Sequence, residues 1–360
     1  MEKRLKTPLT VRGDCLYCPL SLSLDTYWNC LCDCHHCYLR RLNRTWGQDL
    51  RPVEDGLVRK ILTNGLKNKH PKTSLAHALA QKKTLRFGNK ADPFQPAERK
   101  WRVSRDALLV LQELEWSFVI QTMVTEIMMD YASTIVACRE FCHVQPIISP
   151  GLDKDWEVLE RQRTTHPRER LRHLLELKRK GVKVAVNGEP FIPGFHTIAD
   201  FEDICKLLRE YGIRRYNTYN FHFNDHNAKR LHSVGVDIEA IYENNQDGPW
   251  RKILAKLLDV AEKYDILLGC PDFVNTGPHW YEIANTCCGV DVPNPMTFNT
   301  HTWKRLIQQG KPLKEILTDT WDGVGDFKAG RKVLFGTGKS DIYTMADAGL
   351  VKDGEVLKEF

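Results

Sequence analysis

Short apolar runs alternate with amphipathic segments along much of the chain. The run from Phe118 to Val124 is apolar enough for a buried strand. A helical pattern begins near Pro167 and ends at Gly181, and its apolar face holds Leu171, Leu174 and Leu175. The alternating valines Val182, Val184 and Val186 then read as the next strand. Strands that alternate with helices predict a parallel sheet of the α/β class.

The alternation continues far enough to predict a partial (β/α)6 barrel of the TIM type. Strands are expected over 84–88, 118–124, 144–149, 182–186 and 213–221. Helices are expected over 53–68, 104–114 and 131–141, from 167 onwards and around 201–208. The loops that follow the carboxyl ends of such strands are where this architecture places its chemistry.

The pattern changes after Phe221. A long helix is expected over 238–264, interrupted near 244–248, and is followed by a short strand at 266–268. We therefore divide the chain into an N-terminal segment (1–24) with a cysteine pair, the partial barrel (25–225) and an α+β C-terminal extension (226–360).

Composition indicates a globular protein. The chain has 360 residues and a formal net charge of +6, with 42% hydrophobic and 27% charged residues, which excludes a wholly disordered chain. No apolar run approaches the ~18 residues of a membrane span, and the N-terminus lacks the apolar core of a secretory signal. We expect a cytoplasmic protein without a membrane partner.

Twelve cysteines in such a chain point to metal or redox chemistry rather than to a disulfide framework. Two interpretations compete for those near the N-terminus. Cys15-x2-Cys18 and Cys34-x2-Cys37 have the spacing of a zinc site. Alternatively, Cys30, Cys34 and Cys37 form C-x3-C-x2-C, which can hold three irons of a [4Fe–4S] cluster. Only the second interpretation gives Cys30 a role.

The loop from Cys30 to Tyr38 (CLCDCHHCY) resembles the cluster loop of radical S-adenosylmethionine enzymes. The resemblance implies that Cys30, Cys34 and Cys37 bind a [4Fe–4S] cluster whose open iron chelates S-adenosylmethionine. An electron from the cluster then yields a 5′-deoxyadenosyl radical. His36 is expected to pack near the adenine, and Tyr38 to belong to the same cofactor-binding loop.

Three further segments, in the expected order, are similar to the spore photoproduct lyase-like group of that superfamily. They are Phe87–Glu98 (FGNKADPFQPAE), the Ile148–Leu152 turn (ISPGL) and Glu189–Gly194 (EPFIPG). Together with the cysteine loop they cover roughly residues 25–225. The resemblance therefore implies the same partial barrel and an enzyme of the lyase or isomerase type.

The similar segments also supply candidate cofactor contacts. Gly88, Asn89 and Asp92 are expected along the methionine end of S-adenosylmethionine, and Ser149 near its ribose or carboxylate. Each motif also has a purely structural interpretation. Asp92 and the proline after it can form a simple turn, and Ser149 with its proline can end a strand.

One departure from the lyase pattern concerns the hydrogen donor. The lyase has a donor cysteine just before the aspartate of the second-strand segment, whereas 88–92 of this chain contain no sulfur. Two sources of the hydrogen atom therefore stay open. One is 5′-deoxyadenosine, which returns hydrogen in an isomerase-like reaction, and the other is a different thiol. No catalytic residue is assigned.

The remaining cysteines allow a second metal site. Cys287 and Cys288 are adjacent in a loop rich in glycine and proline, and Cys270 precedes them. With Cys15 and Cys18 they could ligate an auxiliary iron–sulfur cluster or a zinc ion; alternatively they are reduced thiols. Cys138 and Cys142 are expected on one helical face as packing residues, and Cys205 in the core.

Basic residues interleaved with aromatic ones favour nucleic-acid contact. Arg99, Lys100 and Arg102 surround Trp101, and five arginines lie between 161 and 172. Our leading hypothesis is a radical enzyme that acts on a thymine-derived base in DNA, with a flavodoxin or ferredoxin as electron donor. The alternatives are a radical enzyme acting on a peptide or small molecule, and a zinc-ribbon nucleic-acid-binding protein without catalysis.

Overall fold

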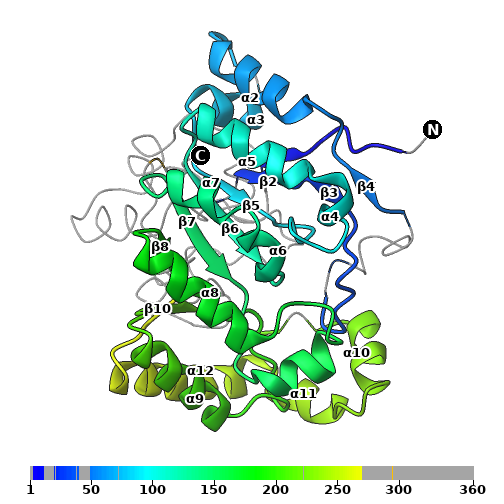
Figure 1. Cartoon of the computed structure of the whole chain (residues 1–360). Helices are drawn as coiled ribbons and strands as arrows, with labels where there is room; N and C mark the ends of the chain where they lie inside the picture. The colour runs from blue at the N-terminus through cyan, green and yellow to red at the C-terminus, as the bar shows by residue number, and fades with distance from the viewer. Residues whose placement is uncertain are drawn as a thin grey trace, which may run out of the picture.

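The computed structural model describes residues 3–11, 20, 22–37, 39, 49–71, 73–221, 223–269 and 294. These residues form a curved, mainly parallel sheet with helices along its outer side (Figure 1). The mixed α/β class and the alternation of strands and helices are as the sequence predicts. Within the described ranges, no helix combines the length and the apolar character that crossing a membrane requires.

The parallel strands form two groups. β2, β5, β6, β7 and β8 pair in that order in the first group, and β9, β10 and β11 pair in that order in the second. β1 is antiparallel to β2 at one edge. The bounds are β1 Leu9–Val11, β2 Leu22–Leu24, β5 Leu85–Phe87, β6 Phe118–Thr122, β7 Cys142–Pro146, β8 Lys183–Val184, β9 Val186–Asn187, β10 Arg215–Asn217 and β11 Leu267–Gly269.

A break at Ala185 separates β8 from β9, but both follow the edge of β7. The Ala185 N–H donates to the carbonyl of Val144 at 3.2 Å, and Asn187 pairs in parallel with Ile147. The two strands therefore act as one interrupted fifth strand. β2 precedes residue 25 and β11 lies beyond residue 225, yet both extend the same sheet; the domain boundaries stay predictions.

The helices begin and end where local sequence signals place them. α8 starts with Pro167 at its first position, and Gly181 (φ 86°) follows its end. Thr197 and Asp200 form a capping box at the start of α9. The bounds are α2 Leu57–Lys67, α3 Ser74–Ala80, α4 Glu98–Trp101, α5 Val103–Glu113, α6 Thr125–Met129, α7 Ala132–Ala137, the π-helix η1 Asp155–Leu159, α8 Pro167–Arg179, α9 Ile198–Glu210, α10 Asp225–His232, α11 Ile238–Asn244 and α12 Asp247–Lys263.

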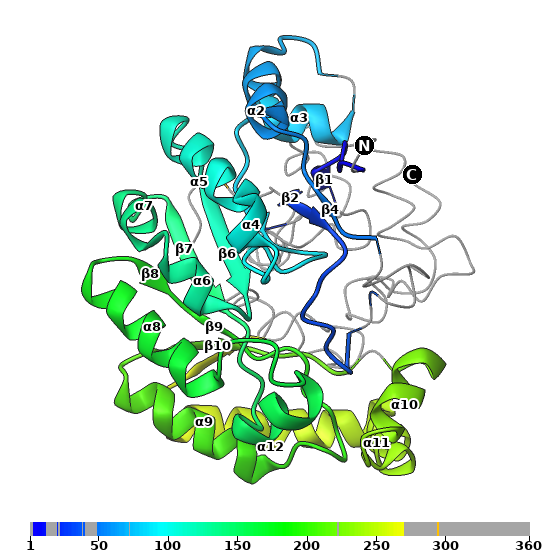
Figure 2. The ribbon, with the colours of Figure 1, turned by 45° about the vertical axis from the view of Figure 1, so that its right-hand side comes forward.

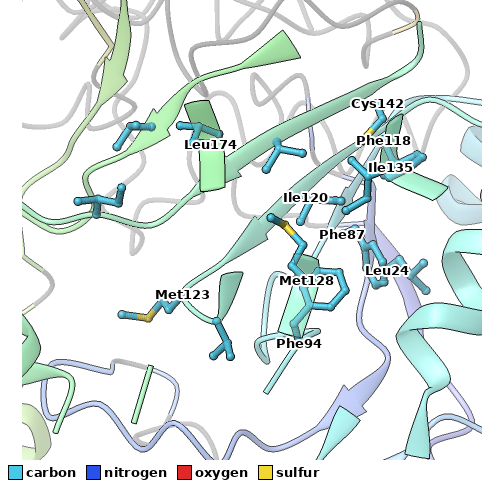
Figure 3. Packing of buried hydrophobic residues seen from close by; sticks show 14 of the residues in the cluster. Leu24, Phe87, Phe94, Phe118, Ile120, Met123, Met128, Ile135, Cys142 and Leu174 are labelled. Atoms are coloured by element: carbon cyan, nitrogen blue, oxygen red, sulfur yellow. The ribbon is translucent and has the colours of Figure 1, made fainter. Parts of the chain in front are cut away.

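Figure 2 shows α5, α7, α8 and α9 along the outer side of the curved sheet. Alternate strand residues face these helices, so Phe118 and Ile120 of β6 pack beside Ile135 of α7 in the main core (Figure 3). Gln121, the residue after Ile120, therefore lies on the opposite, inner face. This alternation separates an apolar outer layer from a polar inner one.

Cys138, Cys142 and Cys205 are fully buried in the main core, which confirms their packing role. Burial raises the pKa of Cys138 to about 11 and that of Cys205 to about 12. The expected shared helical face was wrong, however, because α7 ends at Ala137 and Cys142 opens β7. The chain leaves the helix at Cys138, whose carbonyl accepts the Cys142 N–H at 2.8 Å.

Candidate functional site

The segments singled out in the sequence meet at one edge of the sheet. β2, β5, β6 and β7 are parallel, so the loops that follow them lie at the same, carboxyl-terminal edge. The cysteine loop comes after β2 and lies between β3 (Tyr27–Trp28) and β4 (Arg51–Pro52), which pair as a small antiparallel ribbon. Residues 88–98 follow β5, and Ser149 follows β7. The topology therefore gathers the predicted residues around one site.

The three predicted cluster cysteines lie close together inside this edge. Cys30 and Cys34 are buried and Cys37 is half-buried, and all three are free thiols. Burial raises the pKa of Cys34, and the nearby thiols of Cys37 and Cys30 raise it further. A hydrogen bond from Cys32 lowers the pKa of Cys30. The Cys34 Sγ also lies 3.8 Å from the Sδ of Met123, which follows β6.

Soft thiol side chains are the ligand type that an iron–sulfur cluster needs. In the described part of the chain, no group of three or more His, Cys, Asp or Glu side chains is arranged around one metal position. A cubane spreads its thiolates over different irons, so it needs soft ligands that are near one another but not convergent. The buried Nδ1 atoms of His35 and His36 have no hydrogen-bond partner within the described ranges, which leaves a donor or acceptor available there beside the thiols.

Both histidines are held neutral. Burial lowers the pKa of His36 to about 4, against a weaker opposing effect of Asp155. Burial and the charges of Arg230, Arg161 and Arg163 lower the pKa of His35 to about 4 as well. A neutral ring offers one N–H and one lone pair, so His36 can meet an uncharged heterocycle such as adenine; its contact with the cofactor stays a prediction.

Asp25, directly after β2, holds the segment that was expected to bind the methionine end of the cofactor. Its Oδ1 accepts the N–H groups of Asn89 (2.9 Å), Lys90 (2.6 Å) and Ala91 (3.4 Å). Its Oδ2 is buried and has no hydrogen-bond partner among the residues that the structure describes. Burial raises the pKa of this carboxyl despite the three N–H groups. Asp25 was missed in the sequence because a single acid after a short strand carries no motif.

Asp92 connects two strand ends. One carboxylate oxygen accepts from Thr122 Oγ1 (2.8 Å) and the N–H of Phe94 (2.9 Å), and the other from the N–H of Met123 (2.6 Å). These bonds tie the loop after β5 to the end of β6. They favour the structural interpretation of the Asp92 motif, and its contact with the cofactor stays untested.

The rest of the 87–98 segment braces the cysteine loop. The buried Gln95 accepts the Leu31 N–H at 2.7 Å and donates to the Asn29 carbonyl at 3.1 Å. The buried Glu98 accepts from the hydroxyl of Tyr27 and from the Ser104 N–H. Gln95 therefore holds the loop that carries the thiols directly, and Glu98 holds the strand β3 that leads into it.

Ser149 is buried after β7, and its Oγ lies 3.5 Å from the carbonyl oxygen of Glu189. Its contact with ribose or carboxylate stays a prediction. Tyr38 and the cysteines of the second metal site lie outside the described residues; those cysteines are Cys15, Cys18, Cys270, Cys287 and Cys288.

A buried histidine–aspartate pair stands beside His36. The Nδ1 of His196 accepts the Ile192 N–H at 2.8 Å, so its Nε2 carries the proton that points to Asp155 Oδ1 at 2.8 Å. The other oxygen of Asp155 accepts the Gly151 N–H. This pair joins the ISPGL and EPFIPG segments, which the sequence singled out separately without indicating that they touch.

A row of amide side chains crosses the inner face of the sheet. Gln121 donates to Gln145 (2.6 Å), Gln145 to Asn217 (2.7 Å), and Asn217 to Asn187 (3.0 Å) and to Glu189 (2.9 Å). Asn187 also donates to Glu189 at 3.3 Å. We call these five residues the amide row. One sequence signal could have found it, because β6, β7, β9 and β10 each carry an amide near the carboxyl end.

Most of the expected basic patch is already paired. Arg170 is fully buried against Glu160, and Arg161 and Arg163 both bond Asp33 of the cysteine loop. Of the five arginines between 161 and 172, Arg170 is therefore not available to contact a phosphate. An isolated charge could not be buried there, and Glu160 provides the counterion.

A cavity of about 420 Å³ opens between α4, α6 and the start of α8, and its lining residue Arg163 bonds Asp33 of the cysteine loop. Its lining includes Arg99, Arg163, Trp156 and His166. The Trp156 and His166 rings stand edge to face with centroids 4.8 Å apart. The cavity thus combines aromatic faces with guanidinium groups, though Arg99 also pairs with Glu126 at 2.7 Å.

Comparison with known proteins gives a likeness in fold only. No protein-family model matches the chain, and neither does any curated protein sequence. A cysteine mutant of spore photoproduct lyase with bound dinucleoside spore photoproduct superposes with a TM-score of 0.52 at 9% identity, over 70% of this chain and 76% of that chain. Another cysteine mutant of the lyase gives 0.51 at 11% identity.

SuiB from Streptococcus suis, bound to its precursor peptide SuiA, matches with a TM-score of 0.47 at 10% identity over 73% of this chain. The match spans about half of SuiB, 49% of its length. In its fold, the chain resembles the enzymes of the radical S-adenosylmethionine superfamily.

Proposed function

We propose that the chain is a radical S-adenosylmethionine enzyme that modifies or rearranges a thymine-derived base in DNA. The observation that carries the radical chemistry is the group of free thiols of Cys30, Cys34 and Cys37, on the loop after the first parallel strand of this fold. When bound, a [4Fe–4S] cluster and S-adenosylmethionine supply the electron and the sulfonium from which a 5′-deoxyadenosyl radical forms.

The chain's own residues would hold and orient these groups. Cys30, Cys34 and Cys37 provide the thiolates, and Gln95 keeps their loop against the barrel through two hydrogen bonds. Asp25 fixes the backbone of Asn89 at the same edge. The buried amide row provides a polar inner face on which a substrate with amide or imide groups could be recognised.

Two observations support a DNA base as the substrate. The superposed lyase structure contains a dinucleoside photoproduct. The cavity between α4, α6 and the start of α8 offers Trp156 and His166 for stacking and Arg99 for a phosphate. Because 88–92 contain no sulfur, we propose an isomerase-like or lyase-like outcome that does not use a donor at that position.

The first experiment tests the cluster. The wild-type chain and the variants Cys30→Ala, Cys34→Ala, Cys37→Ala and Cys32→Ala are reconstituted anaerobically, and iron and sulfide are counted. We expect Cys30→Ala, Cys34→Ala and Cys37→Ala each to lose about one [4Fe–4S] cluster per chain. Cys32→Ala, the control within the same loop, should keep the cluster. One equivalent of zinc without an iron–sulfur absorption band would instead support the zinc-ribbon alternative.

The second experiment tests the substrate. Reconstituted enzyme is incubated with S-adenosylmethionine, a reductant and DNA with or without modified thymines, and 5′-deoxyadenosine is measured. We expect the modified DNA to stimulate its release. A cluster-loaded enzyme that no DNA stimulates and that shows no salt-dependent DNA binding would retain the radical chemistry but point to a peptide or small molecule.

A further inference from the structure

Arg230 on α10 reaches back 196 residues to the cysteine loop. Its Nη1 donates to the carbonyl of Cys34 at 2.6 Å, and its Nη2 donates to the carbonyl of Asp33 at 3.0 Å and to Asp33 Oδ1 at 3.1 Å. α10 follows β10, whereas the cysteine loop follows β2 (Figure 1). One side chain therefore links a helix near the end of the barrel to the loop that carries the thiols.

Two more arginines, from the segment after η1, bind the carboxylate of Asp33. Arg161 and Arg163 both donate to Asp33 Oδ2, Arg163 at 3.4 Å. Three guanidinium groups thus face one carboxylate, which leaves an excess of positive charge on this side of the loop. Arg230 is the most sheltered of the three, with 15% of its side chain exposed against 34% for Arg161 and 48% for Arg163.

The Arg230 charge is close enough to act on the thiols. Its Nη1 lies 2.6 Å from the carbonyl oxygen of Cys34, which is one of the three predicted cluster ligands. A sheltered charge is screened less by salt and water than an exposed one. The potential of a cluster depends on nearby charge and on hydrogen bonds around its thiolates, and gaining one electron makes a cluster more negative.

We propose that Arg230 is a positioning residue that fixes the cluster loop and raises the reduction potential of the cluster bound there. The inference rests on the proposed function, since it requires a cluster on Cys30, Cys34 and Cys37. The backbone carbonyls that Arg230 binds belong to Cys34 and to the residue before it, so its hydrogen bonds and its charge act at the same point.

The experiment measures potential and cluster retention rather than turnover. Wild type, Arg230→Gln, Arg230→Lys and Asp33→Asn are reconstituted, and each is titrated with a chemical reductant that supplies one electron per cluster while the reduced cluster is followed by EPR. Iron release to a chelator is timed in parallel. Lys229→Gln is the matched control, because it removes one charge from an exposed position on the same helix.

We expect Arg230→Gln to shift the potential to a more negative value and Asp33→Asn to shift it to a less negative one. Arg230→Lys keeps the charge but cannot make the forked contacts, so its potential stays nearer wild type while iron is released faster. Lys229→Gln moves neither quantity. Opposite shifts at Arg230 and Asp33 are a signature that a purely structural contact would not give.

Unchanged potentials in Arg230→Gln and Asp33→Asn, with full iron content, would overturn the inference. If Arg230→Gln retains no cluster, Asp33→Asn and Arg163→Gln decide the electrostatic part, because they must shift the potential in opposite directions. A wild-type chain that holds no cluster at all would instead overturn the proposed function, so the two failures are distinguishable.

Discussion

Gly88 directly follows β5, and its backbone has a conformation that only glycine adopts easily. Its φ is 90°, and a Cβ at this position would lie 2.5 Å from the carbonyl oxygen of Gln121 and 2.6 Å from Cδ of Pro93. The absence of a side chain lets the loop after β5 cross directly over the end of β6. The identity of this residue is therefore explained by close packing, whether or not its backbone also contacts a cofactor.

Gly88→Ala should destabilise the fold by two separate effects. The positive φ costs about 1–2 kcal/mol, and the steric overlap adds about 1–3 kcal/mol. Gly56→Ala is the control, since Gly56 has a φ of 71° but nothing within 4 Å of the added Cβ. Urea unfolding measures both variants. Equal losses of stability would show that the loop moves away at no cost.

Glu98 gives a prediction about pH. Burial raises the pKa of its carboxyl above the ordinary 4.5, although Tyr27 and two backbone N–H groups oppose the rise. The unfolded chain then ionises at lower pH than the folded one, so the contribution of Glu98 to stability falls as pH rises above 4.5. The stability of wild type relative to Glu98→Gln should be highest below that pH and decline toward neutrality. Urea unfolding of wild type and Glu98→Gln, once below pH 4.5 and once near neutral pH, tests this. The same difference in unfolding free energy between the two proteins at both pH values would contradict it.

At the scale of elements, the segment between β7 and α8 is held by a buried ion pair. Arg170 donates to Glu160, to Thr164 Oγ1 (2.7 Å) and to the carbonyls of Thr165 and Ile147 (both 2.6 Å). One guanidinium thus satisfies two backbone carbonyls of the long segment between β7 and α8. The loop supplies η1 and the arginines that reach Asp33, so its order matters for the candidate site.

Arg170→Met should cost about 3–5 kcal/mol, because it leaves the Glu160 carboxylate buried without a counterion. The double variant Arg170→Met with Glu160→Leu should recover part of that loss, since no unpaired charge remains. Thermal unfolding followed by circular dichroism compares the two. A double variant less stable than Arg170→Met would show that the other hydrogen bonds, rather than the ion pair, dominate.

The elements that the sequence predicted well are those with strong local signals. α8 begins at Pro167 as expected, and the interruption near 244–248 separates α11 from α12. β2 was not anticipated because three alternating residues carry too little periodicity. The expected helix over 131–141 is shorter, since residues 138–142 follow the turn into β7. Short strands depend on their neighbours in the sheet, which a local pattern does not contain.

At the scale of the whole molecule, spacing alone indicated the thiols of Cys30, Cys34 and Cys37, but not what positions them. Gln95 binds Leu31 across 64 residues and Arg230 binds Cys34 across 196. Contacts of that kind arise only when the barrel brings distant loops to one edge. The resemblance named the segments that meet there, whereas Asp25, His196 and the amide row became visible only in three dimensions.

The salt dependence of DNA binding tests whether the cavity that Arg99 lines contacts DNA. If Arg99 contacts a phosphate, Arg99→Gln should weaken binding uniformly and reduce the slope of log K against log salt by about 0.9 for duplex DNA. Arg209→Gln is the control, because Arg209 lies on α9 and pairs with Asp265. Fluorescence anisotropy over a range of salt measures both. An unchanged slope for Arg99→Gln would remove the cavity from the interface.

The amide row has a direction. Every amide in it donates toward Glu189, which as a carboxylate can only accept. Turning Gln145, Asn217 or Asn187 around would therefore break the bonds on both of its sides. A single charge at one end therefore sets the orientation of four dipoles across the interior. Glu189→Gln, nearly identical in shape, would remove that polarity and allow the row two opposite arrangements. A polar ligand lying along it would then meet a surface whose donors and acceptors are no longer fixed.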